Sequence, residues 1–208
     1  MSNWNFFRLR MNINGGTEPD PVPEGTVRTI VFVAALTETT GTWSNITSTS
    51  VSGATNNHWD NCASPSETGL TNSNAIIAQS GHTNSAAKYC LDFSVGGYDD
   101  WYLGSNTEVG WMVGDIYENS TLQNTISNAG GDEIGSDYYW SSTQSTINDD
   151  EAILRRHNAS TRLIKSSTKA IRPQKTLVFS PTTQYSVGSL AFGGIIFRVF
   201  QLDWGNVC

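Results

Sequence analysis

Residues that could perform acid, base or nucleophilic chemistry are few in this 208-residue chain, and their spacing fits no catalytic motif. The three histidines, His58, His82 and His157, each lie in a polar, loop-like stretch with no nucleophile beside them. The sequence contains no P-loop, GxSxG, HExxH or Rossmann glycine pattern. We interpret the histidines as surface residues and predict no catalytic residue.

Acidic side chains occur in three short runs, and two carboxylates at a suitable distance would be typical of a glycosidase. The runs are Asp99–Asp100, Asp132–Glu133 and Asp149–Glu151. Nothing in the sequence places two of these carboxylates at such a distance. A glycan-hydrolysing enzyme is therefore the third-ranked hypothesis.

Aromatic residues in polar surroundings favour ligand binding over catalysis. Three of them lie among Asn, Ser and Gly residues, which predicts that their rings are exposed. An exposed ring can stack on the apolar face of a sugar while neighbouring amide, carboxylate and hydroxyl groups bond to the sugar hydroxyls. The predicted ligand-binding set consists of Trp43, Trp59, Tyr138, Asn148, Asp149 and Asp150.

The composition indicates a neutral, polar surface around a sufficient core. Hydrophobic residues make up 38% of the chain and charged residues 15%, while Ser, Thr and Asn together number 65. The net charge of −7 argues against nucleic acid and anionic membrane partners, which both attract Lys and Arg. No apolar run has the length of a signal peptide core or a membrane-spanning helix, so we expect a soluble protein made in a cytoplasm.

Three cysteines, Cys62, Cys90 and Cys208, lack the paired spacing of a zinc site. In a reducing compartment free buried thiols are expected, and a Cys62–Cys90 disulfide is the alternative. No metal and no cofactor is predicted.

The elements that must position these residues mix helices and strands without regular alternation, which favours an α+β fold. The run IVFVAAL after Thr29 predicts a buried strand. Residues 71–93 show a helical pattern that Gly81 interrupts. Ser105 and Glu108 have the spacing of a capping box at the start of a second helix. The buried stripe of that helix is predicted at Val109, Met112, Val113 and Ile116.

The second half of the chain is predominantly strand-like. The aromatic segment 138–143 predicts one strand, and residues 152–156 and 161–165 predict a hairpin around His157. Residues 168–175 predict a further single strand. The apolar run 193–200 begins with a glycine pair, which lets the backbone pass close to a neighbour.

Residues 1–25 differ from the rest and are predicted to form a docking arm. Three glycines and three prolines in the segment NGGTEPDPVPEG favour an extended linker. A short aromatic and cationic segment precedes that linker and is typical of a peptide that orders against a partner. Its residues are Trp4, Phe6, Phe7, Arg8 and Arg10. The alternative is a frayed terminus.

Five motifs in order resemble the Lcl C-terminal type of bacterial and phage adhesin domain, which has a C-type-lectin-like fold. The chain has the VAAL strand, a Trp-bearing loop, a DDW motif, a WSST strand and a closing AIRP strand. Gly104 replaces the proline usual in the family before the second helix. The matching residues are Asp99, Asp100, Trp101, Leu103, Ser105, Glu108, Trp140, Ser141, Ser142, Thr143, Ala170, Ile171, Arg172 and Pro173.

The resemblance implies a C-type-lectin-like domain over residues 26–176, with two helices and short antiparallel sheets. Residues 177–208 resemble the family's first strand, moved to the end of the chain as in a circular permutation. We expect that strand to complete the sheet of its own copy. The second-ranked alternative is that it completes the sheet of a neighbouring copy, and a third is that it begins a truncated second domain. The calcium motifs of sugar-binding relatives are not matched, so a calcium-independent site is expected. Trp101 and Trp140 match positions typical of core scaffolding.

Together these features predict a non-enzymatic structural protein of a tailed-phage virion, a fibre or decoration, assembled in the host cytoplasm and exposed on the virion surface. The lectin-like domain would bind a host-surface glycan weakly, and many copies would add avidity. The arm would bind other virion proteins, and a homotrimer is expected by analogy. The alternative is a purely structural decoration or cement protein without a ligand.

Overall fold

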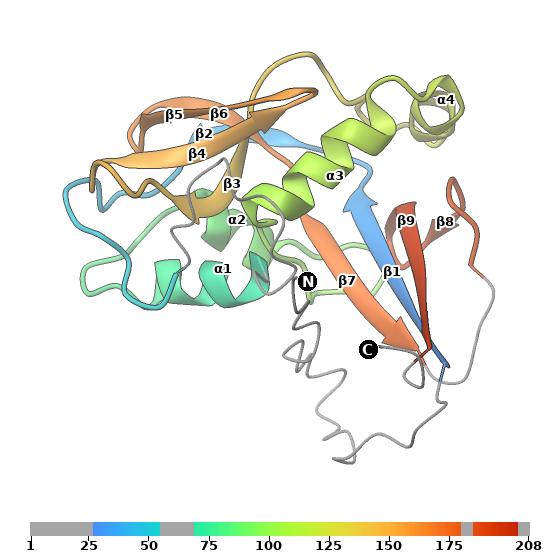
Figure 1. Cartoon of the computed structure of the whole chain (residues 1–208), viewed down its shortest axis with the longest axis horizontal. Coiled ribbons are helices and arrows are strands. Elements are labelled where there is room, and N and C mark those ends of the chain that lie inside the picture. The colour runs from blue at the N-terminus through green and yellow to red at the C-terminus, as the bar shows by residue number, and fades with distance from the viewer. Residues whose placement is uncertain (1–26, 55–68, 180–184, 204–208) are drawn as a thin grey trace, which may run out of the picture.

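The computed structural model describes residues 27–54, 69–179 and 185–203. Within these residues four helices and nine strands form a mixed α+β structure (Figure 1). The helices are α1 (Gly69–Ile77), α2 (Ala86–Asp92), α3 (Asn106–Ile116) and α4 (Ser120–Asn128). The strands are β1 (Val27–Ala35), β2 (Thr39–Thr42), β3 (Tyr139–Gln144), β4 (Glu151–Arg156), β5 (Ala159–Ile164), β6 (Thr168–Ile171), β7 (Gln174–Phe179), β8 (Leu190–Ala191) and β9 (Gly194–Asp203).

The strands form two sheets, one of four strands in the order β7-β1-β9-β8 and one of five in the order β2-β6-β3-β4-β5. Neighbouring strands are antiparallel except β3 and β6, which are parallel. The α+β prediction is confirmed. The predicted number of two helices is wrong, because the pattern over residues 71–93 divides into α1 and α2 and because α4 follows α3. Helix α4 was missed because it buries only Leu122 and Ile126.

The predicted apolar strand is the centre of the four-stranded sheet. Strand β1 pairs with β7 on one side and with β9 on the other. The pairing with β9 runs from Val27 opposite Asp203 to Ala35 opposite Gly194. The strand near the end of the sequence thus lies beside the first described strand of the same chain (Figure 1). Cys90, in α2, is buried with a free thiol, and Cys62 and Cys208 lie outside the described residues.

The single strand predicted over residues 168–175 is wrong, because this segment contributes to both sheets. Strand β6 belongs to the five-stranded sheet and β7 to the four-stranded sheet, with Pro173 at the corner. Arg172 fixes the corner: its fully buried guanidinium donates to the carboxylate of Glu38 at 2.8 Å and to the carbonyl of Ala35 at 3.0 Å. Pro173 accepts a hydrogen bond from the Ala35 N–H at 2.9 Å.

Helix α3 packs against β3, β4 and β9 and so contacts both sheets. Its predicted capping box is confirmed: the Ser105 hydroxyl accepts from the Glu108 N–H, and the Glu108 carboxylate accepts from the Ser105 N–H. The predicted stripe of four apolar residues is buried. Glu108 also accepts from the Gly69 N–H and the Tyr102 hydroxyl, at 2.7 and 3.0 Å. Burial raises the pKa of Glu108, and these hydrogen bonds oppose the shift. One carboxylate therefore joins the starts of α1 and α3.

Candidate functional site

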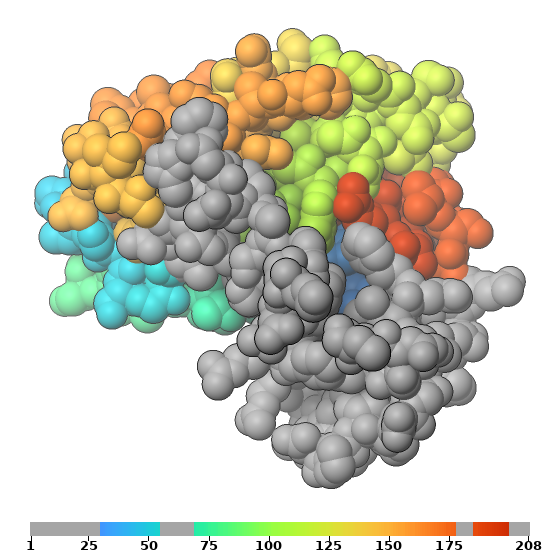
Figure 2. Space-filling model, in the orientation of Figure 1, coloured from blue at the N-terminus to red at the C-terminus, as the bar shows by residue number. Residues whose placement is uncertain are grey.

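Three polar loops meet at one end of the five-stranded sheet and form what we name the loop cluster. They are the loop after β2 (residues 43–54), the turn between α1 and α2 (residues 78–85) and the β3–β4 loop (residues 145–150). The cyan and gold segments adjoin at the left of the space-filling view (Figure 2). The cluster lies where strands β2 and β3 end and β4 begins, so the sheet determines its position.

Asn45 and Ser50 join these loops through hydrogen bonds. The Asn45 amide donates to the Gly81 carbonyl at 3.1 Å and accepts from the N–H groups of Thr83 and Asn84 at 2.9 and 3.1 Å. The Ser50 hydroxyl donates to the Asp149 carboxylate, and the Ser50 carbonyl accepts from the Gln79 amide at 3.4 Å. Because each loop bonds to another, the cluster presents its polar groups in a fixed arrangement.

Lys165 holds two of the loops from below. Its fully buried ammonium donates to the Thr49 carbonyl at 2.9 Å and to the Asp149 carbonyl, and it lies 4.9 Å from the centre of the Trp43 ring. Burial lowers the pKa of Lys165, and the carboxylates of Asp149 and Asp150 oppose that shift. The two carbonyl oxygens and the face of the Trp43 ring replace the water molecules that the ammonium loses on burial.

The prediction that Trp43 is exposed is wrong. Its side chain is fully buried, and its indole N–H donates to the Ser141 carbonyl at 2.7 Å. A tryptophan in a polar sequence can enter the core when its N–H finds a buried acceptor. Trp43 therefore forms the floor of the loop cluster. Trp101 and Trp140 are also fully buried, as predicted.

The other predicted ligand-binding residues are not all brought together. Asn148, Asp149 and Asp150 are exposed in the loop cluster. Tyr138 is half-buried at the opposite end of β3, where the Arg156 guanidinium lies 4.9 Å from its ring centre. Trp59 and the docking arm residues Trp4, Phe6, Phe7, Arg8 and Arg10 lie outside the described residues. The contributions of Asn45, Ser50 and Lys165 were missed, because only the fold brings Asn45 beside the α1–α2 turn and brings Ser50 and Lys165 beside the β3–β4 loop.

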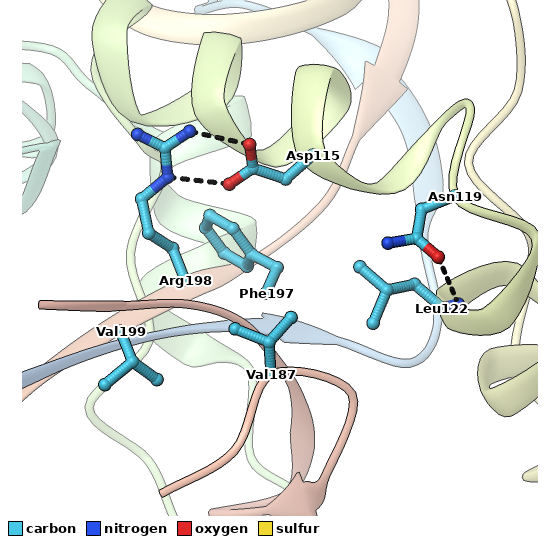
Figure 3. A pocket seen from close by; sticks show the side chains of 7 residues that line it. All are labelled: Asp115, Asn119, Leu122, Val187, Phe197, Arg198 and Val199. Carbon is cyan, nitrogen blue, oxygen red and sulfur yellow. Dashed lines mark hydrogen bonds and ion pairs between the residues drawn. The ribbon is translucent and has the colours of Figure 1, made fainter.

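A pocket of about 320 Å³ lies elsewhere, between α3, α4 and β9 (Figure 3). Asp115 and Arg198 form a two-bond ion pair at its edge, with both N–O distances 2.6 Å. The pairing register of β1 and β9 shifts between Phe32 and Val33, which places Phe197 and Arg198 opposite this shift. The pocket is lined by Asp115, Asn119, Leu122, Val187, Phe197, Arg198 and Val199. Its two charged groups neutralise each other, so it offers an apolar surface rather than acid–base chemistry.

Across residues 27–54, 69–179 and 185–203, no group of three or more His, Cys, Asp or Glu side chains is placed to hold a metal ion. In the same residues no helix has both the length and the apolar character needed to cross a bilayer.

Comparisons with known proteins give one match, to a solved structure. No family model and no curated protein matches the chain. A fimbrial protein from Bacteroides ovatus ATCC 8483 is similar in structure, with a TM-score of 0.49 and 19% sequence identity. The match covers 69% of this chain and 35% of the fimbrial protein, so the chain spans about a third of that protein's length.

Proposed function

We propose that this chain is a non-enzymatic structural protein displayed on the surface of a tailed-phage virion, as a fibre or decoration, and that its loop cluster binds a host-surface glycan weakly. The observation that carries the proposal is the fixed arrangement of exposed amide, hydroxyl and carboxylate groups in that cluster. Such groups bond to sugar hydroxyls in both directions, as donors and acceptors.

Rigidity supports binding at this site. Lys165 and Asn45 hold the loops before any ligand arrives, so little conformational entropy is lost on binding. Asn148 and Asp150 are exposed beside the Ser50–Asp149 hydrogen bond, within reach of a sugar lying over the loops. A single site of this kind is weak, and many copies on one particle would raise the avidity.

The proposed fold is a C-type-lectin-like domain with its first strand permuted to the end of the chain. The pairing of β9 with β1, the Ser105–Glu108 capping box and the burial of the motif tryptophans support it. We further propose that the segment Trp4–Arg10 binds other virion proteins, that the chain assembles as a homotrimer, and that it reaches the virion surface by assembly in the host cytoplasm. Immunogold labelling of purified virions tests the location.

A glycan array tests the ligand. The full chain, displayed on tetrameric streptavidin, should bind at least one class of glycan. The double substitution Asn148→Ala and Asp150→Ala should abolish the signal, because both side chains are exposed in the loop cluster. Asn124→Ala, an exposed amide on α4, is the matched control and should bind normally. If the wild-type chain binds no glycan at this valency, the purely structural decoration role replaces the proposal.

A further inference from the structure

Four apolar side chains form a surface at the turn between β8 and β9, which we name the hairpin patch: Val95, Tyr98, Tyr185 and Phe192. The ring of Phe192 contacts the ring of Tyr98 edge to face, with centroids 5.9 Å apart, and the ring of Tyr185 at 5.4 Å. Val95 packs against the turn at Gly193. Val95 and Tyr98 remain 37% and 38% exposed. Three neighbouring rings that stay partly exposed are typical of a docking surface.

The backbone of Phe192 is in an unfavourable conformation, although its ring packs only partly against the core cluster of Val31, Trp101 and Ile196. Phe192 and Gly193 form the two-residue turn between β8 and β9, with φ of 54° and 81°. Positive φ at both positions is the pattern of a type I′ turn, which favours Asn and Gly. A phenylalanine is a poor residue for this conformation. The partly exposed ring of Phe192 therefore stands at a position whose backbone conformation disfavours phenylalanine.

Carboxylates border the hairpin patch. Asp99, next to Tyr98, is exposed, and Asp100 is 53% exposed while its carboxylate contacts the buried ammonium of Lys175. That ammonium lies 4.6 Å from the centre of the Tyr98 ring. Two carboxylates against one buried cation leave an excess negative charge at the border of the patch.

We infer that the hairpin patch binds the segment Trp4–Arg10 of a second copy of this chain; the inference rests on the proposed homotrimer and makes a neighbouring copy one of the virion proteins that the segment binds. The segment WNFFRLR carries three aromatic side chains for the apolar patch and two arginines for its acidic border. Arginine can both pair with carboxylates and stack on aromatic rings. No other stretch of the chain combines three aromatic residues with two arginines so closely.

The arm and the hairpin patch are unlike surfaces at opposite ends of β1, so a contact between two copies would be head-to-tail. The linker is also long enough to reach the patch of its own copy, and a monomeric wild type is the outcome that would reveal that arrangement. The chain enters β1 at Val27, opposite Asp203, whereas the hairpin patch adjoins Gly194, opposite Ala35 (Figure 1). The two places are therefore separated by the nine residues of β1, about 30 Å. The 16 residues 11–26 can span up to about 55 Å, enough to reach a neighbour. A contact between unlike surfaces closes into a ring or grows into a filament.

Analytical ultracentrifugation of the full chain over a range of concentrations tests the inference. The wild-type chain should form assemblies of three or more copies. Phe192→Asn should raise the dissociation constant at least about tenfold, because it removes the central ring while suiting the turn. Phe6→Ser with Phe7→Ser should have the same effect without touching the described core. Ile164→Asn, on β5 and 48% exposed in the wild type, is the matched control and should leave assembly unchanged.

A charge exchange sharpens the test. Arg8→Glu with Arg10→Glu should weaken assembly, and adding Asp99→Lys should restore part of it, because the charges would again be complementary. A wild-type chain that is monomeric at every concentration would overturn the inference. The inference would also be overturned if the Phe192→Asn variant assembled normally but no longer bound glycans. The hairpin patch would then be a sugar-binding surface and not a docking surface for a second copy. Loss of assembly with normal glycan binding supports the inference and leaves the proposed function intact.

Discussion

The five-stranded sheet and the four-stranded sheet bury different kinds of side chains. All six residues of β3 are buried, and four of them are polar: Ser141, Ser142, Thr143 and Gln144. The core residues of β1 and β9 are aliphatic or aromatic, such as Val31, Val33 and Ile196. Strand β3 thus depends on particular hydrogen bonds, and strands β1 and β9 depend on filled volume. We name the two sheets polar and apolar after these strands, although β7 of the apolar sheet also buries Gln174, Lys175 and Thr176.

The polar residues of β3 take the place of missing strand partners. Pairing between β3 and β4 shifts between Trp140 and Gln144. The Gln144 amide instead binds both backbone groups of Val51, at 2.8 and 2.9 Å, and the Ser141 hydroxyl donates to the Ile153 carbonyl at 2.8 Å. These bonds attach the loop cluster to the sheet. The polar sheet is accordingly the one that positions exposed loops.

The largest expected effect is at Trp101, which lies between α2 and α3 and packs against the apolar sheet. Trp101→Ala should lower the free energy of unfolding by about 4 kcal/mol, because it empties a fully buried site beside Val31, Val33 and Ile196. Denaturant titration followed by circular dichroism measures the change. Trp101→Phe should lose less than half as much, and an equal loss for both substitutions would contradict a volume effect.

The largest effect on the polar sheet is expected at Lys165. Lys165→Met keeps most of the apolar stem but leaves the carbonyls of Thr49 and Asp149 without their donor, which should cost about 3 kcal/mol. Hydrogen exchange should increase in residues 43–54 and 145–150. Increased exchange confined to other regions would show that Lys165 does not hold the loops.

Gln144 and Ile196 provide a direct test of the difference between the sheets. Gln144→Leu, which nearly conserves volume, should cost about 2 kcal/mol because two backbone groups of Val51 lose their partners. Ile196→Val, which removes one methylene from the apolar sheet, should cost about 1 kcal/mol. Thermal unfolding of both variants measures the order. The reverse order would mean that hydrogen bonds contribute little to the polar sheet.

The smallest effect at neutral pH is expected at Lys175, the buried cation of the four-stranded sheet. Burial lowers its pKa to about 8, against the opposing charge of Asp99. Between pH 8 and about 10.5 the unfolded chain keeps a proton that the folded chain has lost, so folding becomes more favourable as pH rises. At pH 7 the lost ion pair of Lys175→Met offsets part of the removed desolvation cost, so the net effect of the substitution is small.

The measurement is the free energy of unfolding of both proteins from pH 7 to 10. The wild type should gain stability relative to Lys175→Met above pH 8. A constant difference across this range would contradict the lowered pKa.

The parts of the fold that local patterns determine were predicted well. The apolar strand β1, the Ser105–Glu108 capping box, the break near Gly81 and the β4–β5 hairpin each depend on residues close in sequence. The hairpin turns at Asn158, whose φ of 62° suits asparagine.

Features that depend on distant partners were not predicted. The change of sheet at Pro173 requires the buried Arg172 to reach Glu38, and the burial of Trp43 requires Lys165 and Ser141. In the candidate site only Asn148, Asp149 and Asp150 were placed together correctly, since they are consecutive. The residues that hold their loop come from other parts of the chain. Periodicity contains no information about such contacts.

The pairing of β1 with β9 has a consequence for synthesis on the ribosome. Ala35 pairs with Gly194, which is translated 159 positions later, a delay of about 10–30 s. For most of that time both edges of the nascent β1 segment lack their native neighbours, β7 and β9, and an apolar strand with open edges is prone to aggregate. Chaperones that bind nascent chains should therefore associate with β1 until translation is nearly finished.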